Sequence, residues 1–335
     1  MKRVGCVMAL LGACHLVLAT EWVRPGVNTN TPVWGVRGGL LWAIPPGELR
    51  PRGGPRGLIR VGYPVLTNGG YSLINFIAVE PIVRGRRGFS ELEPCPTDGR
   101  PGKQFWAVRD GADTNRHELV PGTLSRCGAG AEELAVTVRV APFQNGAHVR
   151  LVIRQRSDAP GEIRLAVYAE PDSAPLEACI LTATMGNLVR ARQLWLRGRV
   201  VHCRELYPQH RGDGFAPHCF YAVDQLSRGR DGDVLVAITS DEAVPASVFP
   251  FPFTRRWYYG GVPVTQYWKK SAAAVRPGLR AVVNARYTYW QTQRAIPGGV
   301  AFENFEFHEP YHAGQEFIFG ITHQSPAELG LAIAP

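Results

Sequence analysis

The chain has 335 residues, of which 45% are hydrophobic and 19% are charged, and it contains 37 glycines and 27 prolines. This apolar content excludes an intrinsically disordered chain, and the many glycines and prolines exclude a helical bundle or coiled coil. The net charge is +9, and 33 of the 37 basic residues are arginines. We therefore expect a basic, turn-rich protein built mainly from β-strands.

The first 19 residues have the features of a secretory signal peptide. Two basic residues precede an apolar run, and Ala19 closes the run with a small side chain. The run is shorter than the ~20 residues that a membrane-spanning helix needs. We expect no transmembrane segment, a mature domain over residues 20–335, and export to the periplasm, the cell surface or the medium. A lipobox-like stretch ending at Cys14 leaves lipoprotein anchoring as an alternative.

The excess of arginine indicates a class of partner. Removal of Lys2 and Arg3 with the leader lowers the formal charge from +9 to +7. Guanidinium groups bind carboxylate, sulfate and phosphate through planar two-point contacts, which predicts a glycan or another anionic polymer as partner. Export argues against nucleic acid. The alternative is that the arginines are scattered over a solvated surface, and the sequence does not indicate an oligomeric state.

The mature chain keeps an odd number of cysteines, so at least one of them cannot pair within the chain. They are Cys95, Cys127, Cys179, Cys203 and Cys219. Cys203 and Cys219 flank a loop that a disulfide could close, whereas Cys179 lies in an apolar run and is expected to be a buried free thiol. The sequence has no CxxC pair, so it predicts no metal site of thiolate ligands, and it indicates no cofactor.

The predicted strands begin with a nearly continuous apolar run over residues 71–83, typical of a central strand covered on both faces. Alternation of apolar and polar residues then predicts four strands, over residues 134–140, 149–155, 163–169 and 178–184. The Asn145-Gly146 pair between the first two favours a hairpin. The simplest arrangement is a four-strand meander.

Five later strands are expected, over residues 233–240, 264–269, 281–290, 301–308 and 316–322. About a dozen strands in ~310 residues fit a large, mainly antiparallel β-sandwich better than a small immunoglobulin-like module. Residues 45–57 and 93–130 are rich in turn-forming residues and are expected to be long surface loops, with a subdomain boundary near residue 130. Little helix is expected.

Several segments resemble those of a family of secreted bacterial all-β proteins to which no activity is attached. These segments are residues 24–30, 75–81, 172–187, 284–290 and 314–317. The resemblance covers most of the mature chain. The organisation is also similar, at the level of fold alone, to the large sandwiches of sugar epimerases (mutarotase-like), polysaccharide lyases and glycosidase accessory domains.

The residues His308-Glu309-Pro310-Tyr311-His312 spell the H-E-x-x-H pattern of zinc proteases. That motif requires a helix that places both histidines on one face, and Pro310 disrupts a helix at this point. The preceding residues alternate as a strand does. We therefore predict a strand end and a turn here, and no metal site.

Glu80 ends an apolar strand and is followed by a group of arginines. If the carboxyl is buried, Arg84 or Arg86 can neutralise it, and loss of hydration would raise its pKa toward that of a general acid. A structural ion pair is the alternative. Asn75 lies on the opposite face of the same strand.

A loop between Pro208 and Pro217 has the composition of a catalytic site. Tyr207, His210, Arg211 and His218 lie in or beside it. A Tyr or His beside an Arg can remove a proton next to a uronate carboxylate, as β-elimination requires. The alternative is an exposed loop in which these residue types occur by chance.

Aromatic residues are concentrated late in the chain, where flat rings could stack on sugar faces. Alternation places Asn284, Arg286 and Trp290 on one face of a strand, and Trp257 and Tyr259 lie nearby in the sequence. These five residues are predicted to bind ligand, together with Arg84, Arg86 and Arg211. We expect an Arg286→Ala change to weaken the binding of acidic glycans and to leave the stability of the protein little changed. The alternative is that Trp290 packs between sheets and Arg286 pairs with Glu303 or Glu306.

The sequence contains no Walker loop, no G-x-S-x-G elbow and no dinucleotide-binding pattern. The predicted function is therefore binding or processing of a glycan, with Tyr207, His210, His218 and Glu80 as the candidate catalytic residues. If the protein is an enzyme, a lyase, an epimerase or a glycosidase is expected. A noncatalytic structural protein of the cell envelope is the alternative.

Overall fold

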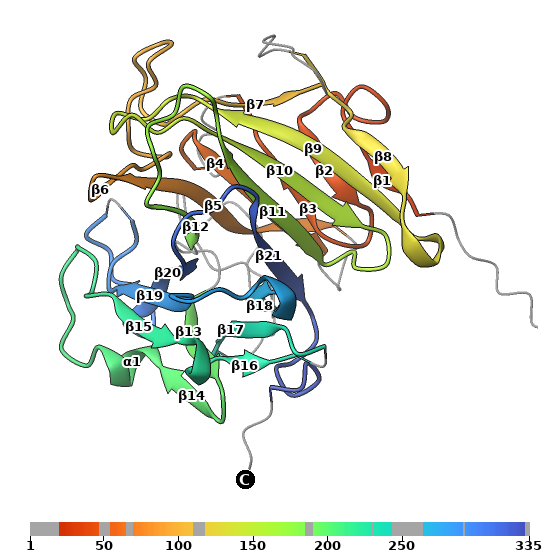
Figure 1. Ribbon diagram of the computed structural model, residues 1–335. Helices are drawn as coiled ribbons and strands as arrows, with labels where there is room; N and C mark the ends of the chain where they lie inside the picture. Colours follow the sequence, from red (N-terminus) through yellow and green to blue (C-terminus); the bar gives the residue numbers. More distant parts are fainter. Residues whose placement is uncertain are drawn as a thin grey trace, which may run out of the picture.

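The computed structural model describes residues 20–46, 54–64, 70–109, 118–184, 190–229, 231–242, 264–290 and 292–331. These residues form two large antiparallel sheets that pack face to face (Figure 1). The predicted all-β sandwich is confirmed. The predicted leader at residues 1–19 lies outside the described residues, and export and the boundary near residue 130 stay predictions.

Sheet I has ten strands. In spatial order they are β1 (Trp22–Val23), β2 (Val33–Val36), β3 (Leu41–Ala43), β4 (Leu58–Pro64), β5 (Tyr71–Val83), β12 (Ala178–Thr184), β20 (Ala301–His308), β19 (Arg280–Arg286) and β15 (Cys219–Ala222), with β6 (Arg86–Arg87) beside β5. The long strand β5 is central, as its continuous apolar sequence predicted.

Sheet II has eleven strands. In spatial order they are β14 (Arg199–His202), β13 (Ala191–Leu196), β17 (Val234–Ser240), β18 (Thr265–Lys270), β21 (Gln315–Thr322), β11 (Glu162–Ala169), β10 (Val149–Arg156), β9 (Glu132–Val140) and β7 (Phe105–Val108), with β16 (Ser227–Arg228) beside β17 and β8 (Thr123–Arg126) beside β9.

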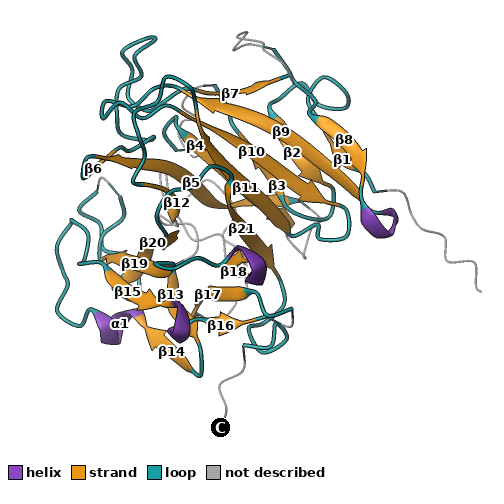
Figure 2. Ribbon diagram, in the orientation of Figure 1, coloured by secondary structure: helices purple, strands orange, loops and turns teal. Residues whose placement is uncertain are grey.

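Helix is rare in the described part of the chain (Figure 2). The helical segments are α1 (Cys203–Leu206) and three short 3-10 helices at Gly128–Gly130, Val223–Gln225 and Ala272–Ala274. No helix among the described residues is long and apolar enough to cross a membrane.

The hydrophobic core fills the space between the two sheets. Alternation selects the side chains that enter it: along β9, Leu134, Val136 and Val138 are buried, while the residues between them are half-buried. A polar contact also crosses the core. The Asn75 amide of sheet I donates a hydrogen bond to Gln266 Oε1 of sheet II at 2.6 Å. This contact confirms that Asn75 faces away from Glu80.

The predicted four-strand meander is wrong in its last strand. Strands β9, β10 and β11 are consecutive neighbours in sheet II, but β12 lies in sheet I between β5 and β20. The chain crosses from one sheet to the other in the turn at Pro171–Ser173, so this turn is a crossover between sheets. The predicted hairpin at Asn145-Gly146 is confirmed, with Gly146 at φ +89°.

Candidate functional site

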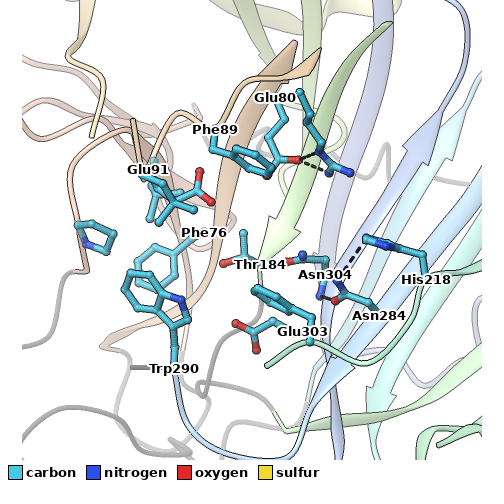
Figure 3. A pocket seen from close by; sticks show the side chains of 15 residues that line it. Phe76, Glu80, Phe89, Glu91, Thr184, His218, Asn284, Trp290, Glu303 and Asn304 are labelled. Carbon is cyan, nitrogen blue, oxygen red and sulfur yellow. Dashed lines mark hydrogen bonds and ion pairs between the residues drawn. The ribbon is translucent and has the colours of Figure 1, made fainter. Parts of the chain in front are cut away.

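A cavity of about 330 Å³ lies on the outer face of sheet I, the face turned away from sheet II (Figure 3). Ile77 and Val79 of β5 enter the core, so Phe76 and Glu80, at the even positions, face outward. Segments after β6, before β15 and after β19 cover this face. The cavity is lined by Pro55, Leu58, Phe76, Glu80, Arg87, Phe89, Glu91, Leu92, Thr184, Phe215, His218, Asn284, Trp290, Glu303 and Asn304.

A β-bulge brings two adjacent polar residues of β20 to the cavity. Val283 pairs with Phe305 and Ala285 pairs with Phe302, so Asn284 of β19 lies opposite both Glu303 and Asn304. In a regular strand these two neighbours would point to opposite faces, and a bulge is the usual device that re-aims one of them. Both side chains therefore reach the cavity (Figure 3).

Asn284 fixes the protonation of His218. Its Oδ1 accepts the backbone N–H of Asn304 at 3.0 Å, so its NH₂ group is the part that faces His218 Nε2, at 3.3 Å. Because an amide NH₂ can only donate, Nε2 must accept, and the imidazole is neutral with its proton on Nδ1. Partial loss of hydration lowers the pKa of His218, in the same direction.

Glu303 is a buried carboxyl without a hydrogen-bond partner on one of its oxygens. The side chain is 4% exposed, and its Oε2 atom has no partner among the described residues. Burial raises the pKa of Glu303 to about 7, against the attraction of Arg286. This carboxyl can therefore both give and take a proton near neutral pH.

Glu91 supplies a second such group from the segment after β6. Its Oε2 atom is buried and also lacks a hydrogen-bond partner among the described residues. Burial raises the pKa of Glu91 to about 7. In Figure 3 Glu91 and Glu303 approach the cavity from two sides, next to the rings of Phe76 and Trp290.

Glu80, which also lines the cavity, is bonded in a network with Arg87 and Glu306. Its partner is Arg87, whose Nε donates to Glu80 Oε2 at 2.6 Å and whose Nη2 donates to Glu306 Oε1 at 3.1 Å. Burial raises the pKa of Glu80 against the attraction of Arg87, and the charges of Glu91 and Glu306 raise it further. Burial alone would also raise the pKa of Glu306, but a 2.6 Å hydrogen bond with His308 and the charge of Arg87 hold it at about 2.

The predicted partners of Glu80 were Arg84 and Arg86, and this prediction is wrong. Arg84 and Gly85 both have positive φ and form a tight hairpin turn in which Arg87 pairs with Ile82. Ile82 lies on the same face of β5 as Glu80, so the register selects Arg87. Arg84 and Arg86 are exposed.

Of the four residues predicted for the catalytic loop, only His218 lines the cavity, where Phe215 of the same loop joins it. Tyr207 is buried in the core and its hydroxyl donates to the Pro217 carbonyl at 2.8 Å. His210 contacts the Gly214 carbonyl at 3.2 Å, and Arg211 lies over the Tyr287 ring at 5.3 Å. None of these three residues lines the cavity, so the predicted grouping for β-elimination is not formed.

The predicted aromatic and arginine surface is present in part. Asn284 and Trp290 line the cavity, whereas Arg286 is buried beside it and donates to the carbonyls of Asp213 and Thr288 at 2.6 and 3.3 Å. An Arg286→Ala change would remove these bonds, so we now expect it to lower stability as well. Arg286 forms no ion pair with Glu303 or Glu306 among the described residues. Trp257 and Tyr259 lie outside the described residues.

Sequence reasoning missed four residues of the site, Arg87, Glu91, Glu303 and Asn304. A signal for two of them exists in β20, where Glu303 and Asn304 stand together between Phe302 and Phe305 and interrupt the alternation. Two adjacent polar residues in an alternating strand indicate a bulge. Glu91 lies in a turn-rich loop and has no comparable signal.

The cysteines and the H-E-x-x-H residues form no metal or disulfide site in the described part of the chain. Cys95, Cys127, Cys179, Cys203 and Cys219 are all free thiols, so the disulfide considered for Cys203 and Cys219 is not present. Strand β20 ends at His308 and no helix follows, as Pro310 predicted. No group of three or more His, Cys, Asp or Glu side chains in the described residues could hold a metal ion.

Comparison with known proteins gives no family. No family model matches the chain, and no curated protein matches it. Among solved structures, the chain is similar to the galactosidase domain of the alpha-galactosidase-sucrose kinase AgaSK, with a TM-score of 0.39, 8% identity and coverage of 92% of this chain and 42% of that one. It is also similar to the crystal structure of HI1317, with a TM-score of 0.28, 9% identity and coverage of 91% and 100%. Likenesses this weak carry no argument about function.

Proposed function

We propose that the cavity on the outer face of sheet I binds one sugar unit and that the protein is an enzyme that transfers protons to and from it. The observation that carries this proposal is the pair of carboxyls, Glu91 and Glu303, that line one cavity, each with a buried oxygen that lacks a hydrogen-bond partner. Ligand hydroxyl groups would supply the missing hydrogen bonds. The rings of Phe76 and Trp290 offer apolar surface for the C–H face of a sugar ring.

The reaction that needs only these groups is interconversion of the two anomers of an aldose. One carboxylate takes the proton of the anomeric hydroxyl while the other carboxylic acid gives a proton to the ring oxygen, and the bond between the anomeric carbon and the ring oxygen breaks. Rotation of the resulting aldehyde and reversal of both transfers close the ring as the other anomer. With a pKa of about 7, each carboxyl can take either role.

The charge of the cavity favours a sugar without a carboxylate. Among the described residues, three carboxyl groups line the cavity, and the one guanidinium that lines it, on Arg87, is already bonded to Glu80 and Glu306. The volume of about 330 Å³ is at the small end for ligand pockets, so a single unit fits better than a polymer segment. Among the predicted glycan ligands, we therefore expect the cavity to bind a small sugar that is uncharged or cationic. Export of the protein stays a prediction.

Nuclear magnetic resonance tests both parts of this proposal. Saturation-transfer spectra with a panel of aldoses and uronic acids report binding, and exchange spectroscopy between the two anomeric protons reports turnover. We expect the wild type to accelerate anomer exchange of an aldose, and Glu303→Gln to abolish the acceleration while binding persists. Glu316→Gln, on the outer face of sheet II, is the matched control and should behave as wild type.

Three results bear directly on the proposal. Binding without acceleration would reduce the protein to a noncatalytic sugar-binding module. No binding of any sugar at millimolar concentration would refute the proposal and favour a structural role for the buried polar residues. Acceleration that Glu303→Gln leaves intact would refute the assigned role of that residue.

A further inference from the structure

The carboxyl groups around the cavity outnumber the guanidinium groups. Glu80 of β5, Glu303 and Glu306 of β20 and Glu91 of the loop after β6 are the carboxyls, and Arg87 of β6 and Arg286 of β19 are the arginines whose charges lower the pKa values of these carboxyls. The two histidines in the same region are His218, which is neutral, and His308, which is bonded to Glu306. Among the described residues, these four carboxyls therefore outnumber the two arginines that act on them.

The hydrogen bonds identify which two carboxyls are in excess. Arg87 donates to Glu80 and Glu306, and Arg286 donates to two backbone carbonyls. Neither guanidinium donates to Glu91 or Glu303 in the described part of the structure. The two carboxyls without a cation are thus the two whose Oε2 atoms lack hydrogen bonds and which face the cavity.

We propose that the natural ligand of the cavity is an amino sugar, whose ammonium group binds between Glu91 and Glu303. An ammonium group has three donors and one positive charge, so it satisfies both orphaned oxygens and balances the acidic excess. A hydroxyl group supplies hydrogen bonds without charge, and a carboxylate adds to the excess. The nearby rings of Phe76 and Trp290 also favour a cation. This inference rests on the proposed sugar-binding function and names the substrate class.

The binding reaction should release protons. Burial raises the pKa of both carboxyls to about 7, so each holds a proton for about half of the time at that pH. An ammonium group favours the ionised form of each carboxyl and so displaces those protons. A neutral sugar brings no positive charge that favours the ionised carboxyls, so its binding should release few protons or none.

Isothermal titration calorimetry of the full chain at pH 7 tests the inference. Glucosamine, galactosamine and mannosamine are compared with their parent hexoses and N-acetyl derivatives, each in phosphate and in MOPS, neither of which carries a primary amine. We expect at least one amino sugar to bind about tenfold or more tightly than its parent hexose and N-acetyl form, because a charge-assisted pair replaces a neutral hydrogen bond. Its apparent enthalpy should differ between the buffers because protons are released.

Two isosteric variants locate the effect. Glu303→Gln and Glu91→Gln should each reduce the preference for the amine to a few-fold and diminish proton release, whereas Glu316→Gln should change neither. Circular dichroism verifies that each variant is folded. If a variant fails to fold, the affinities of the wild type for the amino sugars, the hexoses and the N-acetyl derivatives still test whether the cavity prefers an amine.

The outcomes separate this inference from the proposed function. Equal binding of hexoses and amino sugars would overturn the inference and leave the sugar site standing. Binding of no sugar would overturn both. Binding of ethanolamine as tight as that of the amino sugars would show that the cavity recognises an amine alone, which would overturn the sugar proposal and the inference that rests on it.

Discussion

The two outer faces of the sandwich differ in how they hold charged side chains. On sheet I the charged groups lie beneath loops: Glu80, Glu303 and Glu306 are each no more than 4% exposed. On sheet II the charged groups are partly exposed, and Arg150, Arg154 and Arg164 have 30–36% of their side-chain surface in contact with solvent. Both faces carry arginines and glutamates, so the type of residue does not explain the difference.

The difference shows that the covering loops make the site. On sheet II arginines of β10 and β11 pair with glutamates at 3.2–3.8 Å, and these arginines stay partly exposed to water. On sheet I the segments that carry Glu91, Phe215 and Trp290 exclude water from the same kind of side chains. Loss of hydration then raises pKa values and leaves oxygens that only a ligand can satisfy.

The largest expected effect is on stability when the shared cation of the covered face is removed. Arg87→Ala leaves Glu80 and Glu306 buried without their guanidinium, and we expect a loss of about 3–5 kcal/mol in the free energy of unfolding. Urea denaturation at pH 7 measures this loss. Arg154→Ala on sheet II, whose partners Glu133 and Glu316 are partly exposed, is the control and should cost less than about 1 kcal/mol. Equal losses in the two variants would contradict the contrast between the faces.

A smaller effect is expected in the dependence of stability on pH. The pKa of Glu303 is raised from 4.5 to about 7 in the folded state, so its contribution is fully present below pH 4.5 and is lost as pH rises through 7. Between pH 5 and 8 the wild type should therefore lose on the order of 2–3 kcal/mol relative to Glu303→Gln. Parallel stability curves for the two proteins over this range would show that the carboxyl is not buried in an unpaired state.

The smallest expected effect is on ligand affinity. Trp290→Ala removes one aromatic wall of the cavity and should weaken sugar binding by about 1–2 kcal/mol, a change of about 5- to 30-fold. Trp195→Ala is the matched control, because Trp195 lies on sheet II and bonds to Thr239 away from the cavity. Calorimetry measures the affinity of each variant for sugar. An equal fall in Trp290→Ala and Trp195→Ala would indicate a general loss of structure.

The strands could be predicted because their signal is local. In β9 and β10 the alternation of apolar and polar residues matches the alternation of buried and half-buried residues. The position of β12 could not be predicted, because a turn between two strands looks the same whether the chain stays in one sheet or crosses to the other.

The site was harder to predict because it depends on register and on covering loops. The true partner of Glu80 lies one residue beyond Arg86, and only the turn at Arg84-Gly85 decides between them. The pairing of Glu91 with Glu303 joins a loop to a strand more than 200 residues away, and no local pattern connects them. By contrast, the position of Asn284 on the outer face of β19 was predictable, whereas β19 ends at Arg286 and Trp290 reaches the cavity from the segment that follows.

A ¹³C nuclear magnetic resonance titration of the glutamate carboxyl carbons tests the central claim most directly. Spectra of the wild type, Glu91→Gln and Glu303→Gln between pH 3 and 9 assign the resonances of the two cavity carboxyls. We predict that both titrate near pH 7 in the free protein and that each signal disappears in its own variant. Titration of every glutamate below about pH 5 would contradict the account, since it would mean that water or a cation already satisfies the carboxyls to which we assign the ligand.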